Sequence, residues 1–286
     1  MSRRDRATVP FDQIQPGDSI GTLTYALTPD LVDRHLRATG QAPYADASIA
    51  PVSMLAAEGV NLADLHYDIS QSVHAGQWLE VVSLPRVGDV LTVSGRALDK
   101  FVKKGRRYVV AETRTEVKGG RDVARGRMTG VIVYAEGADE REDAPGPSAA
   151  ASPSAAAAAA DAPALDTLPP LGRTMSLESM VLYEPPGEQN IHTTDEIARA
   201  AGLPAAIATG TLFLAYVFDQ LHSVYGPASL PGTELDVRIR LPVFAGDRIE
   251  SGAEVTSREG GRVHHRVRCT GPHGDVIVGT ACVRAK

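Results

Sequence analysis

The chain has 286 residues, of which 43% are hydrophobic, and a formal net charge of −6 at pH 7. This length and composition can bury full hydrophobic cores without a disulfide or a metal ion. The basic residues are scattered, which argues against binding to a nucleic-acid backbone, and no apolar run approaches the ~20 residues of a membrane span. We therefore expect no nucleic-acid or membrane partner and favour a small or carrier-bound substrate.

The amino-terminal segment and the cysteines bear on the cellular compartment. The first six residues are rich in charge, and no apolar run typical of a secretory leader follows them. The two cysteines, Cys269 and Cys282, lie in strand-like runs, and an isolated pair fits a reducing compartment. We expect a cytoplasmic protein in which both cysteines are small buried apolar side chains.

The composition changes between Glu136 and Leu168, where Ala, Pro, Ser, Asp and Glu predominate and six alanines follow one another at 155–160. Such a segment offers too little apolar area to offset the conformational entropy lost on ordering, so it predicts a mobile linker. We accordingly divide the chain into a first domain (1–136), a linker (137–167) and a second domain (168–286).

The two domains repeat one pattern. Leu84–Asp89 and Leu241–Asp247 both end in Gly-Asp, and each opens a block in which apolar and polar residues alternate as in strands. Glycine-containing segments at 103–107 and 259–262 interrupt these blocks and favour antiparallel hairpins. The repetition suggests a duplicated domain.

Each half also carries an apolar helix upstream of its hairpins, within Pro51–Asp64 in the first half and at Thr209–His222 in the second. The second helix is apolar on nearly all sides, which predicts that it is buried. A long buried helix wrapped by an antiparallel sheet is the hotdog arrangement. The sequence therefore predicts an α+β double hotdog.

The segment from Gly187 to Thr211 sets His192 just before a short Ala-rich helix and ends in a Gly-containing start to the apolar helix. It resembles the signature of MaoC-like hydratases and dehydratases, which are hotdog enzymes acting on acyl thioesters. The first half, with Val73–Trp78 ahead of Leu84–Asp89, looks like the dehydratase-type N-terminal half of double hotdogs. The resemblance covers nearly everything outside the linker.

The resemblance implies a hydro-lyase of fatty acid or polyketide metabolism that interconverts a 3-hydroxyacyl thioester and a 2-enoyl thioester. Loss of water requires a base at C2, an acid at the leaving hydroxyl, and stabilisation of the enolate oxygen. Carried over by position, His192 is the acid/base and the backbone N–H of Gly210 holds the thioester oxygen. Glycine permits close approach, and the helix start adds partial positive charge.

The same resemblance implies that no cofactor is needed beyond the carrier of the acyl group. The partner is an acyl-coenzyme A or an acyl carrier protein, and the chain is a monomeric pseudodimer or a homodimer.

Two positions depart from the family pattern. Gly187 stands where the family has an Asp, and Thr209 stands where it has a His at the helix start. Glu188, one position later, and Asn190 are the two alternatives for the polar partner of His192, and both are placed with the catalytic residues. The expected substrate-binding residues are Gly187, Ile207, Thr209 and Thr211.

Other residues are weaker candidates for a catalytic or binding role. The first half has Gln41–Ala47 where a signature would lie, so we expect it to be degenerate and to cover the acyl chain. His264 and His265 are adjacent on a strand and face opposite sides, which is poor geometry for one metal ion and predicts strand surface. The basic residues of 103–107 predict a solvated turn, and contact with a coenzyme A or phosphopantetheine phosphate is the alternative.

Two other functions remain open. A hotdog thioesterase needs a carboxylate that activates water, and Glu188 could supply it, whereas Asp219 lies about 14 Å along the helix from Gly210 and is too distant. A non-catalytic subunit that binds an acyl thioester is suggested by Gly187 and Thr209, which replace the expected acid and histidine.

Overall fold

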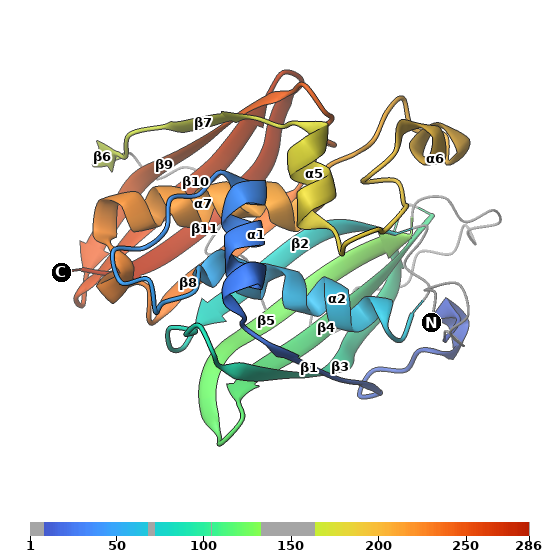
Figure 1. Cartoon of the computed structure of the whole chain (residues 1–286), viewed down its shortest axis with the longest axis horizontal. Helices are drawn as coiled ribbons and strands as arrows, with labels where there is room; N and C mark the ends of the chain where they lie inside the picture. Colours follow the sequence, from blue (N-terminus) through green and yellow to red (C-terminus); the bar gives the residue numbers. More distant parts are fainter. Residues whose placement is uncertain (1–8, 68–71, 104, 133–163, 286) are drawn as a thin grey trace.

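The computed structural model of the chain describes residues 9–67, 72–103, 105–132 and 164–285. Within them, two sets of antiparallel strands form one 11-stranded sheet that curves around helices (Figure 1). Most of the expected linker, 137–163, lies outside the described residues. Among the helices described, none is long and apolar enough to cross a membrane.

The first half builds a five-stranded sheet in the order β1-β3-β4-β5-β2. The predicted apolar helix is present, but it begins as a 3-10 helix and continues as a short α-helix that packs on β1, β3, β4 and β5. The elements are η2 (Phe11–Gln13), β1 (Ser19–Ala26), α1 (Pro29–Thr39), η3 (Val52–Ala57), α2 (Glu58–Asp64), β2 (Ser72–Val81), β3 (Val90–Lys103), β4 (Arg106–Val117) and β5 (Arg121–Ile132).

The second half builds a sheet in the order β8-β11-β10-β9-β6, and β7 also pairs with β9. Its long helix α7 lies along the inner face of this sheet (Figure 1). The elements are β6 (Asp166–Thr167), β7 (Leu171–Thr174), α5 (Leu177–Tyr183), α6 (Asp195–Ala200), α7 (Gly210–Tyr225), η4 (Pro227–Ser229), β8 (Thr233–Ile239), β9 (Arg248–Glu259), β10 (Arg262–Gly271) and β11 (Gly274–Arg284).

The two half-sheets join edge to edge through β2 and β8, which pair antiparallel with Gln77 opposite Val237 and Leu79 opposite Leu235. The two helical segments η3 and α7 pack against each other across the junction, as α1 and α5 do (Figure 1). Pairing removes the exposed edge that each half-sheet would otherwise present. The arrangement is that of a pseudodimer within one chain.

The repeated Gly-Asp turns have the same structure in both halves. Gly88 and Gly246 have φ of +94° and +96°, a conformation that strains residues with a Cβ. Asp89 and Asp247 each accept a hydrogen bond at 2.9 Å from the backbone N–H three residues earlier. The sequence repeat therefore reports a structural repeat.

The starts of the two central helices are equivalent as well. Ala50 and Ala208 donate their N–H groups to the carbonyl oxygens of Pro85 and Val243, at 2.9 and 2.8 Å. The equivalent of Gly210, two residues after Ala208, is accordingly Val52. The first half thus has a branched side chain where the second has a glycine.

Helix α7 is buried along almost its whole length, as expected, and its side chains from Thr211 to Leu221 lie in the core. Both cysteines are free and buried. The two adjacent histidines do face opposite sides of β10, but the expectation of strand surface is wrong for His265. Its side chain is buried and its Nε2 lies 2.7 Å from the Tyr225 hydroxyl at the end of α7, because that face of β10 packs on the helix.

Candidate active site

The imidazole of His192 is anchored through one nitrogen. Its Nδ1 lies 2.7 Å from the carbonyl oxygen of Ile207, which can only accept, so Nδ1 carries the hydrogen. In the neutral ring Nε2 is then the nitrogen with a free lone pair. Ile207 itself is held by a 3.0 Å bond from its N–H to the carbonyl of Ile191. The half-buried His192 side chain therefore presents a base of defined tautomer.

Asn190 ties the loop that carries His192. Its Oδ1 accepts a hydrogen bond from the backbone N–H of His192 at 2.8 Å, and its Nδ2 donates to Oε2 of Glu184 at 2.9 Å. Both ends of the amide are thereby engaged, which fixes its orientation. Asn190 contacts the histidine through the backbone.

Glu184 is a carboxylate that the sequence analysis missed. It directly follows α5, is 7% exposed, and its Oε1 accepts a hydrogen bond from the Thr209 hydroxyl at 2.7 Å. It lies eight residues before His192, outside the stretch that resembles the family signature. In the sequence, the feature that could have pointed to Glu184 is a charged residue directly after the apolar positions of a short helix. One buried carboxylate therefore links Asn190 with Thr209 at the start of α7.

Gly187 lies in a tight turn, where a Cβ added to it would meet nothing within 4 Å. The Glu188 N–H donates to the carbonyl of Pro185 at 3.0 Å, and Gly187 has φ of +79°, as the third residue of a type II turn requires. Gly187 is exposed, and Glu188 is half-buried directly after the turn. The position at which the family carries its Asp is thus a turn position here.

The start of α7 is closely packed around Gly210. A Cβ added there would lie 2.7 Å from Cδ1 of Ile239 and 3.3 Å from Nδ1 of His74, a residue of the first half. The first amides of an α-helix have no intrahelical acceptor, and they carry partial positive charge. An oxyanion at this helix start would meet a favourable potential.

Thr211, in the first turn of α7, is buried, and its hydroxyl makes no hydrogen bond with the described residues. The hydroxyl of Tyr183 is also buried without a hydrogen bond to the described residues. Burial raises the pKa of Tyr183, and the neighbouring Thr211 hydroxyl opposes the shift. Two buried hydroxyls therefore lie next to each other near the helix start, on the side of α5.

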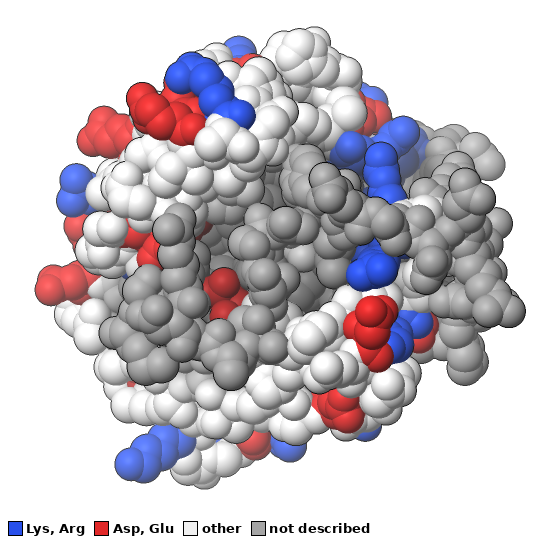
Figure 2. Space-filling model, turned by 90° about the vertical axis from the view of Figure 1, so that its right-hand side faces the viewer, with Lys and Arg blue, Asp and Glu red and all other residues white. Residues whose placement is uncertain are grey.

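Charge on the face shown in Figure 2 is mixed in sign. Acidic and basic side chains are interspersed over it. In the β3–β4 hairpin Lys103 and Arg106 are exposed, whereas Arg107 lies over the Phe11 ring, 5.4 Å from its centroid. Within the described ranges, no group of three or more His, Cys, Asp or Glu side chains could hold a metal ion.

Comparisons with known proteins give matches of structure only. No protein-family model matches the chain, and no curated protein matches its sequence. A solved structure named MaoC-like dehydratase is 18% identical and covers 95% of this chain and 99% of its own, with a TM-score of 0.73. A Mycobacterium tuberculosis protein described as a double hotdog is 16% identical, with coverages of 96% and 97% and a TM-score of 0.66.

A putative oleoyl thioesterase from Lactobacillus plantarum is also similar, at 12% identity, with coverages of 94% and 97% and a TM-score of 0.61. These likenesses confirm the predicted fold, which is an α+β double hotdog. The resemblance to MaoC-like dehydratases seen in the sequence is confirmed at the level of the fold over nearly the whole chain.

Proposed function

We propose that the protein is a hydro-lyase that interconverts a 3-hydroxyacyl thioester and a 2-enoyl thioester, carried by coenzyme A or by an acyl carrier protein. The observation that supports it best is the fixed tautomer of His192, whose Nδ1 is bound to the carbonyl of Ile207 three residues before Gly210. This hydrogen bond ties the His192 imidazole to the segment that leads directly into the start of α7. The structural likeness to a MaoC-like dehydratase agrees with this reaction class.

In the dehydration direction, the neutral Nε2 of His192 takes the proton from C2 while the Gly210 amide holds the thioester oxygen on which negative charge develops. The C3–O bond then breaks, and the imidazolium returns its proton to the leaving hydroxide. Water is released and His192 is neutral again. Hydration follows the same path in reverse.

Glu184 is the carboxylate that we assign to this site in place of Glu188. Through Asn190 it holds the backbone at His192, and through Thr209 it holds the start of α7, so it sets the relative position of base and oxyanion donor. Catalysis depends on such positioning because reacting atoms must meet in a near-attack geometry. We propose that the first half covers the acyl chain.

The test is whether the protein hydrates 2-enoyl thioesters with acyl groups from short to long. The loss of enoyl absorbance measures the rate. Each acyl group is offered on coenzyme A and on an acyl carrier protein, which identifies the carrier. Formation of a 3-hydroxyacyl product supports the proposal. Absence of turnover with every acyl group on both carriers contradicts it and favours a non-catalytic subunit that binds thioesters.

An acyl thioesterase is the second candidate, because a putative thioesterase is among the structural neighbours. That reaction needs a carboxylate that activates water against the thioester carbon, and Glu184 or Glu188 would supply it. Release of free thiol from a saturated acyl-coenzyme A, which offers a hydro-lyase no reaction, separates the two activities.

A further inference from the structure

The side chain of His74 reaches the site because β2 contains a β-bulge. The pairing of β2 with β5 shifts between His74 and Gly76, so Ala75 is an extra residue in the strand. Strict alternation would put His74 on the face of Gly76, but the extra residue moves it to the face of Gln77 and Leu79, which are buried. His74 therefore points inward, toward α7.

The ring of His74 has a defined tautomer. Its Nε2 lies 3.0 Å from the carbonyl oxygen of Gly76, an acceptor, so Nε2 carries the hydrogen and Nδ1 carries the lone pair. Burial lowers the pKa of His74 to about 4, although the Gly76 carbonyl and the Gln77 side chain oppose this shift. The ring is consequently neutral at pH 7, and Nδ1 is an acceptor.

This acceptor is buried and receives no hydrogen bond from the described residues. It lies against the first residue of α7, 3.3 Å from the point that a Cβ of Gly210 would occupy. The side chain of Gln77 neighbours the His74 ring, and its Oε1 is a second buried acceptor that receives no hydrogen bond from the described residues. Buried polar atoms in native proteins are nearly always satisfied, and two neighbouring acceptors cannot satisfy each other, so they indicate a donor that is not part of the chain.

We propose that His74, supplied by the first hotdog, is a substrate-binding residue of the site in the second, where its Nδ1 accepts a hydrogen bond from an N–H or O–H group of the bound thioester. The inference rests on the proposed function, because the thioester oxygen is placed at the Gly210 amide. The donor is either the 3-hydroxyl of the acyl group or the amide N–H of the pantetheine arm. The first half then contributes to binding as well as covering the acyl chain.

Two substitutions separate this role from a structural one. His74→Asn keeps an acceptor, Oδ1, at the position of Nδ1 and loses the group at Nε2. His74→Gln keeps a donor at the position of Nε2, for the carbonyl of Gly76, and loses the acceptor. If Nδ1 binds the ligand, His74→Asn retains affinity and His74→Gln loses it. If the ring only holds the bulge, the order is reversed.

The probes are butyryl-coenzyme A, which has no 3-hydroxyl, and 3-hydroxybutyryl-coenzyme A. We expect His74→Gln and His74→Leu to weaken binding roughly 3- to 10-fold, the scale of one hydrogen bond. We expect His74→Asn to bind with nearly the affinity of the wild type. A larger Kd of the variants for butyryl-coenzyme A, measured by calorimetry, identifies the pantetheine amide as the donor. A raised KM confined to 3-hydroxybutyryl-coenzyme A identifies the hydroxyl.

The inference is overturned if all three variants bind both probes as the wild type does, or if His74→Gln restores binding and His74→Asn does not. His264→Leu, on the outer face of β10, is the matched histidine control, and Tm is measured for every variant. The proposed function has its own outcome. If the binding of butyryl-coenzyme A depends on His74 but the wild type hydrates no enoyl thioester, this inference stands and the proposal of a hydro-lyase is wrong.

Discussion

The Thr209 hydroxyl donates a hydrogen bond of 2.7 Å to the carboxylate of Glu184, which joins the end of α5 to the start of α7. The family to which the signature is similar has a histidine at the position of Thr209, and it has its carboxylate five residues before the position of His192. Here the carboxylate comes from eight residues before His192 and reaches the helix start from the side of α5. The carboxylate nearest to this helix start along these hydrogen bonds is therefore that of Glu184, which lies outside the signature.

Glu184→Gln should lower kcat more than Glu188→Gln does. The amide can no longer accept from both Asn190 and Thr209 with a full negative charge, so the loop at His192 and the start of α7 lose their common anchor. We expect a loss of about 10-fold or more, since small misplacements of catalytic groups are costly.

The measurement is the initial rate of enoyl thioester hydration for the two variants, with Tm as the control for folding. A larger loss of kcat in Glu188→Gln would return the carboxylate role to Glu188. Glu184→Ala is less informative, because it leaves two donors without an acceptor and costs about 1–3 kcal/mol of stability for each one that is buried.

His192→Asn should abolish most of the turnover while leaving the loop intact. Its Nδ2 lies at the position of the imidazole Nδ1 and can still donate to the carbonyl of Ile207, but no titrating nitrogen remains at the position of Nε2. We expect kcat to fall by about 10²-fold or more, the scale of a lost general acid/base. Comparison with His192→Ala shows how much of the loss comes from the anchor. Near wild-type turnover of His192→Asn would exclude proton transfer by this residue.

Glu58, a buried residue of α2, should make stability depend on pH. Its carboxylate accepts hydrogen bonds from the hydroxyls of Thr115 and Tyr25. Burial raises the pKa of Glu58 to about 7, and the two hydroxyls only partly oppose the shift. The folded protein thus holds a proton that the unfolded chain, with a pKa of about 4.3, releases. The stability from protonated Glu58 is complete below about pH 4 and is lost as the pH rises through about 7.

Glu58→Gln removes this titration and keeps a polar side chain of the same shape. Relative to the variant, the free energy of unfolding of the wild type should fall by roughly 3 kcal/mol between about pH 4 and pH 8, at 1.36 kcal/mol for each unit of pKa shift. Denaturant unfolding at several pH values measures it. Buried histidines with lowered pKa, such as His35 and His265, lose their contribution as the pH falls, and they cancel because both proteins contain them. Parallel curves for the two proteins would show that Glu58 keeps an ordinary pKa.

The fold was predictable because its signals are local. The Gly-Asp turns at Asp89 and Asp247 combine a positive φ with a side-chain bond to the backbone three residues earlier, and both requirements are visible in the sequence. The buried helix Gly210–Tyr225 was equally clear, because a helix that is apolar on all sides has to lie in a core.

The candidate site was only partly predictable. His192 and Gly210 fall within a short signature, but Glu184 joins the site because α5 packs against α1 and the residue after α5 reaches Thr209, which is a tertiary relationship. His74 faces inward because one extra residue in β2 reverses the alternation of the strand, and a single inserted residue leaves little trace in a hydrophobic pattern. Both residues come from outside the signature.

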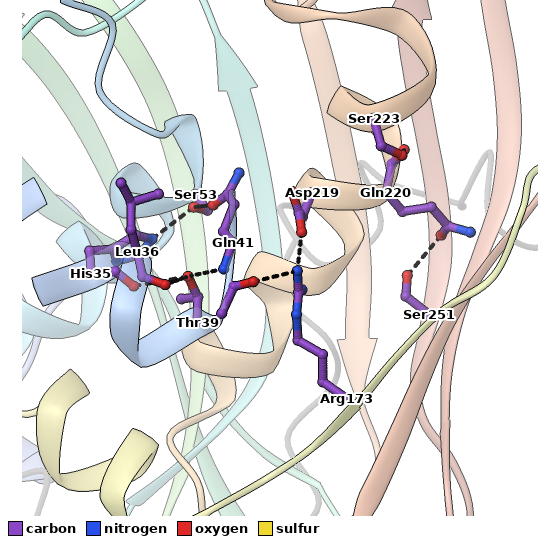
Figure 3. A network of polar contacts seen from close by, with 11 residues as sticks. His35, Leu36, Thr39, Gln41, Ser53, Arg173, Asp219, Gln220, Ser223 and Ser251 are labelled. Atoms are coloured by element: carbon purple, nitrogen blue, oxygen red, sulfur yellow. Dashed lines mark hydrogen bonds and ion pairs between the residues drawn. The ribbon is translucent and has the colours of Figure 1, made fainter. Parts of the chain in front are cut away.

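Asp219, which the sequence placed too far along the helix for catalysis, forms an ion pair within the second half, and the arginine of this pair also contacts the first half. Its carboxylate binds Arg173 of β7, and the same guanidinium donates to the carbonyl of Gly40 after α1 at 2.9 Å (Figure 3). The two side chains are 17% and 9% exposed, and the guanidinium lies 5.0 Å from the centroid of the Tyr216 ring. Breaking such a pair leaves a charge buried without its partner.

Asp219→Leu should therefore destabilise the protein by about 3–5 kcal/mol, whereas the double variant Arg173→Met with Asp219→Leu should cost less than the single one, because it leaves no unpaired charge. The free energies of unfolding of the wild type, of Asp219→Leu, of Arg173→Met and of the double variant form a double-mutant cycle that gives the coupling energy. Since the carbonyl of Gly40 belongs to the first half, part of the cost in Arg173→Met reflects weaker docking of the halves. Additive effects of the two substitutions would show that the pair contributes no coupling and that packing on Tyr216 holds Arg173 in place.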